Sequence, residues 1–535
     1  MSRNDLTAPL IPSQPEVILN IESNGQYEEQ QENMLENPFD FLQVKTPYTI
    51  PTQTPINPFR NSTPKIEGVY EWLKITICLP IALLRLFLFG ASLAVGYVVT
   101  KFALHGWKDK HNPMPKWRCR LLWVTRLCSR CILFSFGYHW IRRKGKPVKR
   151  EIAPIIVSNH VSYIEPIFFF YELFPTIVAS ESHDSIPFVG TIIRAMQVIY
   201  VNRFSSASRK DAVNEIKRKA SCDRFPPLLL FPEGTTTNGR VLISFQLGAF
   251  LPGFPIQPVV VRYPHIHFDQ SWGYISLAKL MFRMFTQFHN FMEVEYLPVV
   301  SPLENKKETV VHFAQRTSYA LANALNVVQT SHSYGDLMLL TKAAEAKQEK
   351  ASSYMVEMAM VESTLNISTV EAVEFLDIFL SMNPDPSGFV RLNDFLRVLR
   401  LPKCHLAEKI FEFIDLENQG SITFKQFLFG SAHVMKQPFF WQACELAFSE
   451  CAVGGSGYIS KQQWSDYIRL AISDMSNEEM HELFSIFDTA NDGNVSKDDF
   501  MTCMRRNPLL VALISPSSMH RDLLEAGDGK LHEVV

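Results

Sequence analysis

The stretch that decides the fold runs from Ile155 to Val261, and it contains three short apolar runs that each border a polar motif. Ile155-Ile156-Val157-Ser158 precedes Asn159-His160-Val161-Ser162-Tyr163-Ile164-Glu165, Leu228-Leu229-Leu230 enters Phe231-Pro232-Glu233-Gly234-Thr235, and Pro255-Ile256-Gln257-Pro258 enters Val259-Val260-Val261. Continuous apolar runs of this length are typical of strands buried on both faces, in a sheet covered by helices. Because open α/β sheets bind ligands at strand ends, the polar motifs are predicted to form the site.

His160 and Glu165 are the candidate catalytic pair. A carboxylate near a loop histidine can fix the imidazole tautomer and stabilise the imidazolium that forms when the histidine accepts a proton. No Ser, Cys or Thr is an obvious nucleophile beside this histidine, so it is predicted to activate a substrate hydroxyl directly. The alternative is structural, because Ser162-x-x-Glu165 fits a capping box and Pro166 fits the first turn of a helix over Ile167–Leu173.

Four sequence blocks resemble, in order and spacing, those of the glycerolipid acyltransferase family, which includes the lysophosphatidic acid and lysophosphatidylcholine acyltransferases. The blocks contain His160, Arg203, Phe231–Thr235, and Pro255 with Pro258. The resemblance extends from about residue 68 to residue 331. It implies an α/β acyltransferase domain with acyl-CoA as co-substrate and without a tightly bound cofactor.

The resemblance also assigns roles to individual residues. His160 matches the catalytic histidine of the family, and Glu165 stands where the family usually has Asp. The substrate-binding set is Asn159, Arg203, Glu233, Gly234, Thr235 and Pro258. The residues alone leave two alternatives open: Arg203 could form a surface ion pair with Asp211 or Glu215, and Glu233 could hold its loop by accepting backbone hydrogen bonds. Pro255 and Pro258 are interpreted as a rigid loop between two strands.

Thr236 and the C-terminal half narrow the resemblance further. Lysophosphatidic acid acyltransferases commonly have Arg after Glu-Gly-Thr, so Thr236 favours a zwitterionic headgroup. With EF-hand-like loops, the chain looks like the EF-hand-bearing lysophosphatidylethanolamine acyltransferases of plants, close to the animal lysophosphatidylcholine acyltransferases. The implied function is acyl-CoA-dependent acylation of the free hydroxyl of lysophosphatidylethanolamine, and of lysophosphatidylcholine or related lysolipids, in phospholipid synthesis and remodelling.

Two alternative functions remain. Lysophosphatidic acid acylation would use the same four blocks. A catalytically inactive, membrane-tethered EF-hand adaptor is the second alternative, because Glu165 departs from the family pattern and Gln246 stands where relatives often have Lys. The net charge of −2, from 52 basic and 54 acidic residues, gives no global attraction to nucleic acid, so no nucleic-acid partner is expected.

Residues 69–145 are predicted to anchor the chain to a membrane. Ile75–Val99 is apolar with Arg85 as its only charge, and a helix of about 25 residues would be ~37 Å long, enough for a ~30 Å hydrocarbon core. One tilted spanning helix, with a kink at Pro80, and a re-entrant helical hairpin both remain open. Leu121–Ile141 is predicted to be a basic amphipathic helix at an anionic leaflet, with a second spanning helix as the alternative.

The location follows from the family resemblance. Membrane lipids and acyl-CoA are the expected partners, and endoplasmic reticulum or Golgi membrane is the implied site, with the catalytic domain facing the cytosol. Residues 1–68 form a polar tail that is predicted to be disordered, without a cleavable signal peptide. Its two Asn-Pro-Phe tripeptides, Asn37–Phe39 and Asn57–Phe59, resemble ligands of endocytic adaptor domains.

The C-terminal half is predicted to be an all-α EF-hand-like domain over residues 369–510, after an acyltransferase domain over 146–335 and a helical linker over 336–368; residues 511–535 form a tail. Four loops keep the glycine that an EF-hand needs at its sixth position: Gly388, Gly420, Gly457 and Gly493. None has Glu at the last position, so a scaffold role is favoured over calcium binding. The best calcium candidates are Asp488, Asp492, Asn494 and Asp499 in the last loop.

Overall fold

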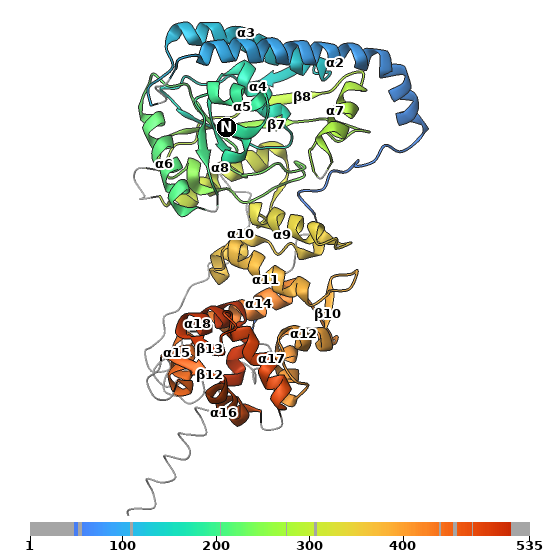
Figure 1. The fold of residues 1–535 in the computed structure, drawn as a ribbon. Coiled ribbons are helices and arrows are strands. Elements are labelled where there is room, and N and C mark those ends of the chain that lie inside the picture. The colour runs from blue at the N-terminus through green and yellow to red at the C-terminus, as the bar shows by residue number, and fades with distance from the viewer. Residues whose placement is uncertain are drawn as a thin grey trace, which may run out of the picture. The chain divides into compact units, whose positions relative to one another are not determined.

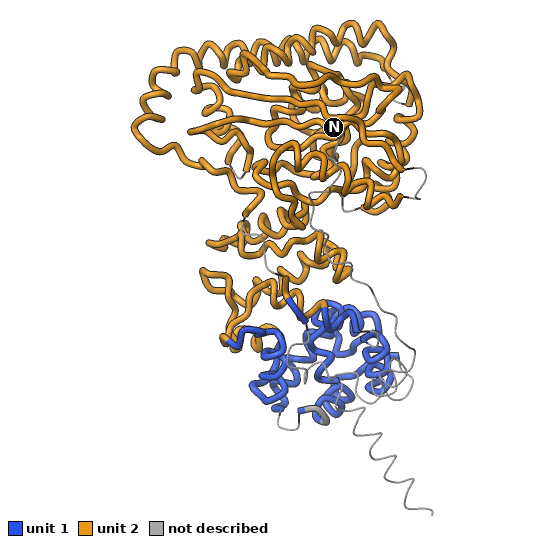
Figure 2. Tube along the Cα trace, turned by 180° about the vertical axis from the view of Figure 1, so that it is seen from behind, with its two compact units in different colours: residues 1–49, 399–418, 433–535 blue, residues 50–398, 419–432 orange. Residues whose placement is uncertain are grey.

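The computed structural model of the chain describes residues 48–51, 56–107, 111–203, 205–273, 275–303, 308–437, 440–452, 457–472 and 475–514. The chain is divided into two compact units, which Figure 2 shows in different colours. The larger unit comprises residues 50–398 and 419–432, and the smaller comprises residues 1–49, 399–418 and 433–535.

A seven-stranded mixed sheet forms the centre of the larger unit (Figure 1). Every neighbouring pair of strands is parallel except β7 and β8. The predicted mixed sheet is confirmed, and the three apolar runs of the sequence are its strands β2, β5 and β7. In spatial order the strands are β1 (Ile141–Lys144), β8 (Met292–Tyr296), β7 (Ile256–Arg262), β2 (Ile155–Ser158), β5 (Leu228–Leu230), β3 (Thr176–Ser180) and β4 (Ile199–Val201).

Helices cover both faces of this sheet, because alternate residues of each strand point to opposite sides. Ile156 of β2 belongs to the core that includes α4 (Ile164–Glu172), whereas its neighbour Ile155 belongs to the core that includes α6 (Ser206–Ser221) and α8 (Val310–Leu325). Burial on both faces explains why β2, β5 and β7 are mostly apolar, with Ser158 and Gln257 as buried polar exceptions. The remaining elements here are η2 (Glu181–Ser185), α5 (Val189–Ala195), η3 (Leu247–Ala249), α7 (Leu277–Phe285), and the paired strands β6 (Val241–Leu242) and β9 (Val328–Gln329).

Two long helices lie side by side along this unit (Figure 1). α2 (Val69–Leu104) runs unbroken through Pro80, and α3 spans Lys116–Ser135. The alternative of a re-entrant hairpin is therefore wrong, as is a second helix that reaches Ile141, because this residue begins β1. Gly96 faces α3, and a Cβ there would lie 3.4 Å from Cys128, at ordinary van der Waals distance.

α2 turns its polar residues toward the protein and its apolar residues outward. Arg85 is buried, and its guanidinium donates hydrogen bonds to the main-chain carbonyls of Phe285, Gln287 and Phe288, at the end of α7. The arginine thus has protein partners, which removes the cost of leaving its charge in lipid. By length and composition, α2 could cross a membrane. Only 22% of its most apolar 18-residue stretch is buried inside the protein, so most of this stretch is not covered by protein. Exposed apolar side chains of α2 and α3 include Leu73, Leu83, Leu84, Phe87, Val98, Phe102, Trp117, Trp123 and Leu127.

Residues 56–65 form an extended segment, the strap, that packs into the larger unit before α2 begins. Phe59 is only 2% exposed and lies in a core cluster with Ile243, Leu340 and Met355. The Asn61 side chain donates hydrogen bonds to the carbonyls of residues 269 and 271. The strap is therefore part of the folded unit.

The strap corrects two expectations for the N-terminal region. The polar tail does not extend to residue 68, since the strap is ordered and buried. Asn57–Phe59 is not a free adaptor ligand in this structure, because Phe59 is in the core, whereas Asn37–Phe39 lies outside the described residues. Composition alone does not predict that the strap is folded, because its polar residues are hydrogen-bonded to loops about 200 residues away.

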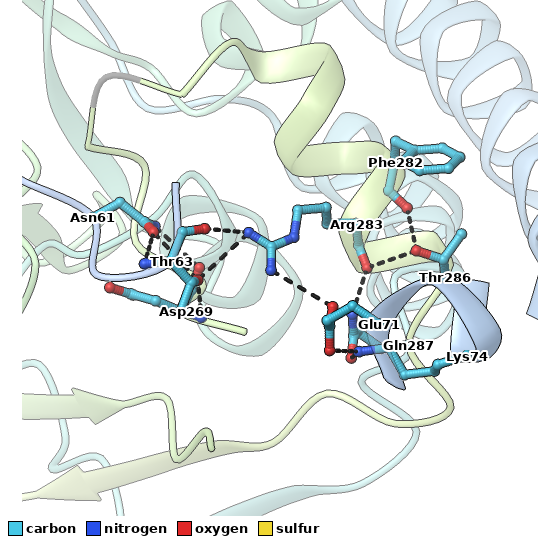
Figure 3. A network of polar contacts seen from close by, with 9 residues as sticks. All are labelled: Asn61, Thr63, Glu71, Lys74, Asp269, Phe282, Arg283, Thr286 and Gln287. Carbon is cyan, nitrogen blue, oxygen red and sulfur yellow. Dashed lines mark hydrogen bonds and ion pairs between the residues drawn. The ribbon is translucent and has the colours of Figure 1, made fainter. Parts of the chain in front are cut away.

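Figure 3 shows how the strap, α2 and α7 are tied together. Arg283 of α7 is 1% exposed and donates a hydrogen bond to the carbonyl of Thr63 in the strap. The same guanidinium lies 3.7 Å from the carboxylate of Glu71 in α2, and that carboxylate also pairs with Lys74. Asp269 accepts hydrogen bonds from the backbone and hydroxyl of Ser62.

The C-terminal half consists of helix–loop–helix repeats, as predicted. Two pairs of loops each form a short antiparallel ladder, with β10 (Phe389–Arg391) on β11 (Ser421–Thr423) and β12 (Tyr458–Ser460) on β13 (Asn494–Ser496). The four predicted loop glycines all have positive φ, between 69° and 87°. The helices are α9 (Tyr334–Glu345), α10 (Met358–Met360), α11 (Thr369–Ser381), α12 (Leu392–Val398), α13 (His405–Ile414), α14 (Phe424–Met435), α15 (Phe440–Cys451), α16 (Lys461–Ala471), α17 (Asn477–Phe487) and α18 (Lys497–Arg506), with short turns η5 (Ala351–Tyr354), η6 (Val361–Leu365) and η7 (Pro508–Leu510).

Candidate active site

His160 lies on the loop between the carboxyl end of β2 and the start of α4. Its Nδ1 is 3.3 Å from Oε2 of Glu165, so this carboxylate orients the ring. The Glu165 side chain is fully buried, whereas the His160 side chain is 18% exposed. With Nδ1 facing the carboxylate, Nε2 is the ring atom left for a substrate proton.

Glu165 also holds the loop that precedes its own helix. Its Oε1 accepts hydrogen bonds from the backbone N–H groups of Val161 and Ser162, each at 3.0 Å. The capping box itself does not form, because the residue before α4 is Tyr163, which makes no side-chain capping bond. The helix begins at Ile164, earlier than predicted.

Two buried tyrosines lie close to Glu165, and no pattern in the sequence indicated them. Burial raises the pKa of Tyr263 well above its usual value, and the charge of Glu165 raises it further. Burial likewise raises the pKa of Tyr138, again with a contribution from Glu165. Both phenols therefore stay neutral at physiological pH. Tyr138 is held by a 2.5 Å hydrogen bond to Gln270.

The Phe231–Thr235 motif holds His160 from the other side. The Phe231 ring stacks on the imidazole with centroids 4.1 Å apart. Glu233 is fully buried, and its Oε1 accepts a 2.9 Å hydrogen bond from the backbone N–H of His160. The backbone N–H of Thr237 donates to the carbonyl of His160 at 2.8 Å. Of the two roles considered for Glu233, the geometry places it in the structural one.

Asn159 and Pro258 belong to the sheet. The Asn159 amide donates to the carbonyl of Val261 at 2.9 Å, and its carbonyl oxygen accepts from the N–H of Val261 at 2.8 Å. Pro258 is buried inside β7, opposite Val157 of β2. The interpretation of Pro258 as part of a loop is therefore wrong, because the strand already begins at Ile256.

Arg203 lies two residues after the end of β4. Its guanidinium carbon is 4.4 Å from the centroid of the Tyr334 ring. The alternative surface ion pair with Glu215 is not what the structure has, since Glu215 pairs with Arg218 and Lys219.

Gly234 takes φ +75° in this turn, which favours glycine. A Cβ on Gly234 would lie 3.4 Å from Gln246 Cγ and 4.0 Å from Tyr334 Cβ. Thr235, next in the turn, is half-buried. The structure thus brings Arg203, Gly234 and Tyr334 together, and sequence analysis missed the tyrosine because it lies about 100 residues beyond the turn.

The predicted calcium residues lie in the loop between α17 and α18. The Asp488 carboxylate accepts hydrogen bonds from the N–H groups of Asp492 and Gly493, and Asp492 accepts one from the N–H of Asn494. Asp499 accepts hydrogen bonds from the hydroxyls of two neighbouring residues at 2.6 Å. Within the described ranges, no three His, Cys, Asp or Glu side chains converge to hold a metal ion. In this conformation these carboxylates accept hydrogen bonds from backbone and hydroxyl groups within the loop.

Two family models match the chain: one described as Acyltransferase covers residues 141–262, and one described as EF-hand domain pair covers residues 455–507. Lysophospholipid acyltransferase LPEAT2 of Arabidopsis thaliana is 62% identical over 536 aligned residues, which cover 96% of this chain and 99% of that protein. The chain belongs to the lysophospholipid acyltransferases. The predicted family, fold class and enzyme class are confirmed.

More distant relatives of this acyltransferase come from animals. Lysophosphatidylcholine acyltransferase 2 of Mus musculus is 30% identical and covers 74% of this chain and 73% of its own. Lysophosphatidylcholine acyltransferase of Drosophila melanogaster is also 30% identical, and covers 83% and 85%. Among solved structures, the 1-acyl-sn-glycerophosphate acyltransferase PlsC from Thermotoga maritima has a TM-score of 0.36 at 15% identity, covering 47% of this acyltransferase and 96% of that chain.

Proposed function

We propose that this acyltransferase transfers the acyl group of acyl-CoA to the free hydroxyl, at sn-2, of lysophosphatidylethanolamine and of related zwitterionic lysolipids. The observation that carries the proposal is the His160–Glu165 pair at the carboxyl end of β2, where a buried carboxylate orients a partly exposed imidazole. Thr236 and the names of the relatives support a lysophospholipid acceptor.

The reaction needs one base and no acyl-enzyme. Nε2 of His160 accepts the proton of the lysolipid hydroxyl while the oxygen attacks the thioester carbon of acyl-CoA. The new C–O bond forms, the C–S bond breaks, and the CoA thiolate takes the proton from the imidazolium. Glu165 stabilises the imidazolium, and Arg203 binds the lysolipid phosphate through its N–H groups.

The other residues of the predicted substrate-binding set are proposed to support the catalytic pair and the turn beside it. Asn159 bonds the end of β2 to β7, Pro258 lies within β7 opposite Val157, and Glu233 fixes the backbone of His160. Gly234 and Thr235 form the turn against which the acceptor lies. Acyl transfer by membranes that contain the full chain, with a panel of lysophospholipids and with calcium or chelator, tests both the acceptor and the metal. Equal rates on every headgroup, or transfer to lysophosphatidic acid alone, would contradict the proposed acceptor.

The EF-hand-like region is proposed to serve as a scaffold. Its carboxylates are already bonded within the last loop, and the first ladder, between β10 and β11, belongs to the same unit as the catalytic sheet. A loss of activity in the chelator arm of the same assay would overturn this role. The acyltransferase domain is proposed to span residues 146–335, and the EF-hand-like domain residues 369–510.

We propose endoplasmic reticulum or Golgi membrane as the location, with the catalytic unit in the cytosol, where acyl-CoA is available. α2 is proposed to lie along one leaflet and not to span the bilayer. It contacts α3, α5 and α7 along its length, and Arg85 is bonded to the carboxyl end of α7. A spanning α2 would have to carry these polar contacts into lipid, at several kcal/mol for each unsatisfied group.

This topology predicts that both ends of α2 are on the cytosolic face. Single cysteines at the exposed positions Glu67 and Lys116, in a background without the exposed Cys131, should both react with a membrane-impermeant maleimide in sealed microsomes. The background protein without either cysteine is the control. Labelling of only one position until detergent is added would establish a spanning helix instead.

Glu233 predicts a pH dependence of stability. Burial raises the pKa of Glu233 to about 8. Between about pH 5 and 8 the folded state therefore keeps a proton that the unfolded chain releases, so this residue lowers stability progressively as the pH rises through that window. The Glu233→Gln variant lacks this titration and should gain stability relative to the unmodified protein from pH 5 to pH 8.

Thermal unfolding across that pH range is the measurement. Glu215→Gln is a matched control: burial opposes the shift, but Arg218 and Lys219 hold the pKa of Glu215 below its usual value, and so below the window. The difference between this control and the unmodified protein should stay constant. A Glu233→Gln difference that is equally flat from pH 5 to pH 8 would refute the buried neutral carboxyl.

A further inference from the structure

Tyr334 is the first residue of α9, some 70 residues beyond the end of the match to the acyltransferase family at residue 262, yet it packs against the active site. Its ring lies under the guanidinium of Arg203, with 4.4 Å from the guanidinium carbon to the ring centroid. Its Cβ is 4.0 Å from the point where Gly234 would place a Cβ. The tyrosine therefore contacts Arg203 and lies close to Gly234 of the Glu-Gly-Thr turn.

The start of α9 is fixed by a buried carboxylate. Asp336 is fully buried and accepts four backbone hydrogen bonds of 2.8–2.9 Å, from residues 333, 356, 357 and 358. The Ser333 side chain completes a capping box with it. Gly335 has no room for a side chain, because a Cβ there would lie 2.6 Å from the hydroxyl of Thr369. Tyr334 stands between these fixed residues, so its ring has a defined place.

The stacking leaves the arginine able to bind an anion. A cation above an aromatic ring is attracted to the face of the ring, whereas the N–H donors of a guanidinium lie in its own plane. Those donors therefore remain directed outward, where they can form the two parallel bonds with which arginine binds phosphate. An arginine held in this way loses less side-chain entropy when the phosphate binds.

We propose that Tyr334 is a positioning residue for the acceptor headgroup, which holds the Arg203 guanidinium in the place where it meets the phosphate of the lysophospholipid. The inference rests on the proposed function, in which Arg203 binds that phosphate. It also means that the segment after residue 335, predicted as a linker, is needed to complete the acceptor site, because Asp336 fixes α9. The same helix is tied to α11 of the first EF-hand-like repeat by a 2.9 Å ion pair between Lys342 and Asp377.

The test uses the full chain in membranes. Initial rates are measured at varied lysophosphatidylethanolamine with saturating acyl-CoA, and at varied acyl-CoA with saturating lysophosphatidylethanolamine. Tyr334→Leu should raise the KM for the acceptor by about five- to thirtyfold, the change that corresponds to a cation–π contact of roughly 1–2 kcal/mol. The KM for acyl-CoA should not change. Tyr334→Phe keeps the ring and should behave like the unmodified enzyme.

Arg203→Ala separates the inference from the function on which it rests. In that background Tyr334→Leu should have no further effect on the acceptor KM, because the partner of the ring is gone. If Arg203→Ala raises the acceptor KM and Tyr334→Leu does not, the inference is overturned and the proposed role of Arg203 stands. If Arg203→Ala leaves that KM unchanged, the proposed phosphate contact itself is wrong.

Tyr334→Met is the control for a loss of packing, because methionine fills irregular space but has no aromatic ring. If Met and Leu variants both raise only the acceptor KM, while their thermal unfolding matches that of the Phe variant, the positioning role is supported. If both lower kcat and raise the two KM values together, or unfold at a lower temperature while Tyr334→Phe does not, the residue is a packing element and the proposal falls.

Discussion

Replacing His160 by alanine is expected to lower acyl transfer by about 10²- to 10⁴-fold, the usual contribution of a general base. The ring is held by Glu165 on Nδ1 and by Phe231 on its face, so its removal eliminates the one base that this geometry orients toward the acceptor. Acyl transfer from labelled acyl-CoA by membranes that contain the variant is the measurement. Full activity in His160→Ala would end the proposed mechanism.

His312→Ala is the matched control for this experiment. This histidine also has a carboxylate on Nδ1, at 2.7 Å from Glu308, but its side chain is 56% exposed on α8. It should keep full activity. Glu165→Gln adds a second comparison, because the amide keeps an oxygen for the two backbone N–H groups and removes the charge that stabilises the imidazolium. A loss of activity at an unchanged unfolding temperature is expected for that variant.

Arg283→Leu is expected to destabilise the larger unit by about 3–5 kcal/mol, the usual cost of breaking a buried ion pair from one side. The substitution leaves the Glu71 carboxylate buried without the guanidinium and the Thr63 carbonyl without its donor, so α2 and the strap both lose their tie to α7 (Figure 3). Thermal unfolding of the purified protein in detergent or lipid discs should show a clear fall in the transition temperature.

Two variants decide whether the buried charge is the cause. Glu71→Gln alone should also lower the stability, because it takes the carboxylate from both Lys74 and Arg283. Arg397→Leu removes an arginine whose side chain is 59% exposed beside Asp394, and a surface pair of this kind contributes little. Equal shifts for Arg283→Leu and Arg397→Leu would show that the network in Figure 3 does not stabilise the protein.

Local patterns in the sequence determined the sheet and the outline of the site. The apolar runs 155–158, 228–230 and 259–261 lie in central strands because burial on both faces favours consecutive apolar side chains. The five-residue spacing placed Glu165 at His160 because one loop and one helix start connect them. The loop glycines of the EF-hand-like repeats were also predictable, since each stands where the turn needs positive φ.

The tertiary structure alone decided which residues support the catalytic pair. Glu233 reaches the backbone of His160, Asn159 bonds to Val261, and Tyr334 lies under Arg203, over separations of roughly 70 to 130 residues. Periodicity and spacing report only neighbours along one helix or strand, so they carry no information about such contacts. The strap was not predicted for the same reason. The composition of residues 56–65 resembles that of a disordered tail, but distant loops satisfy the hydrogen bonds of Asn61 and Ser62, and Phe59 is buried in the core.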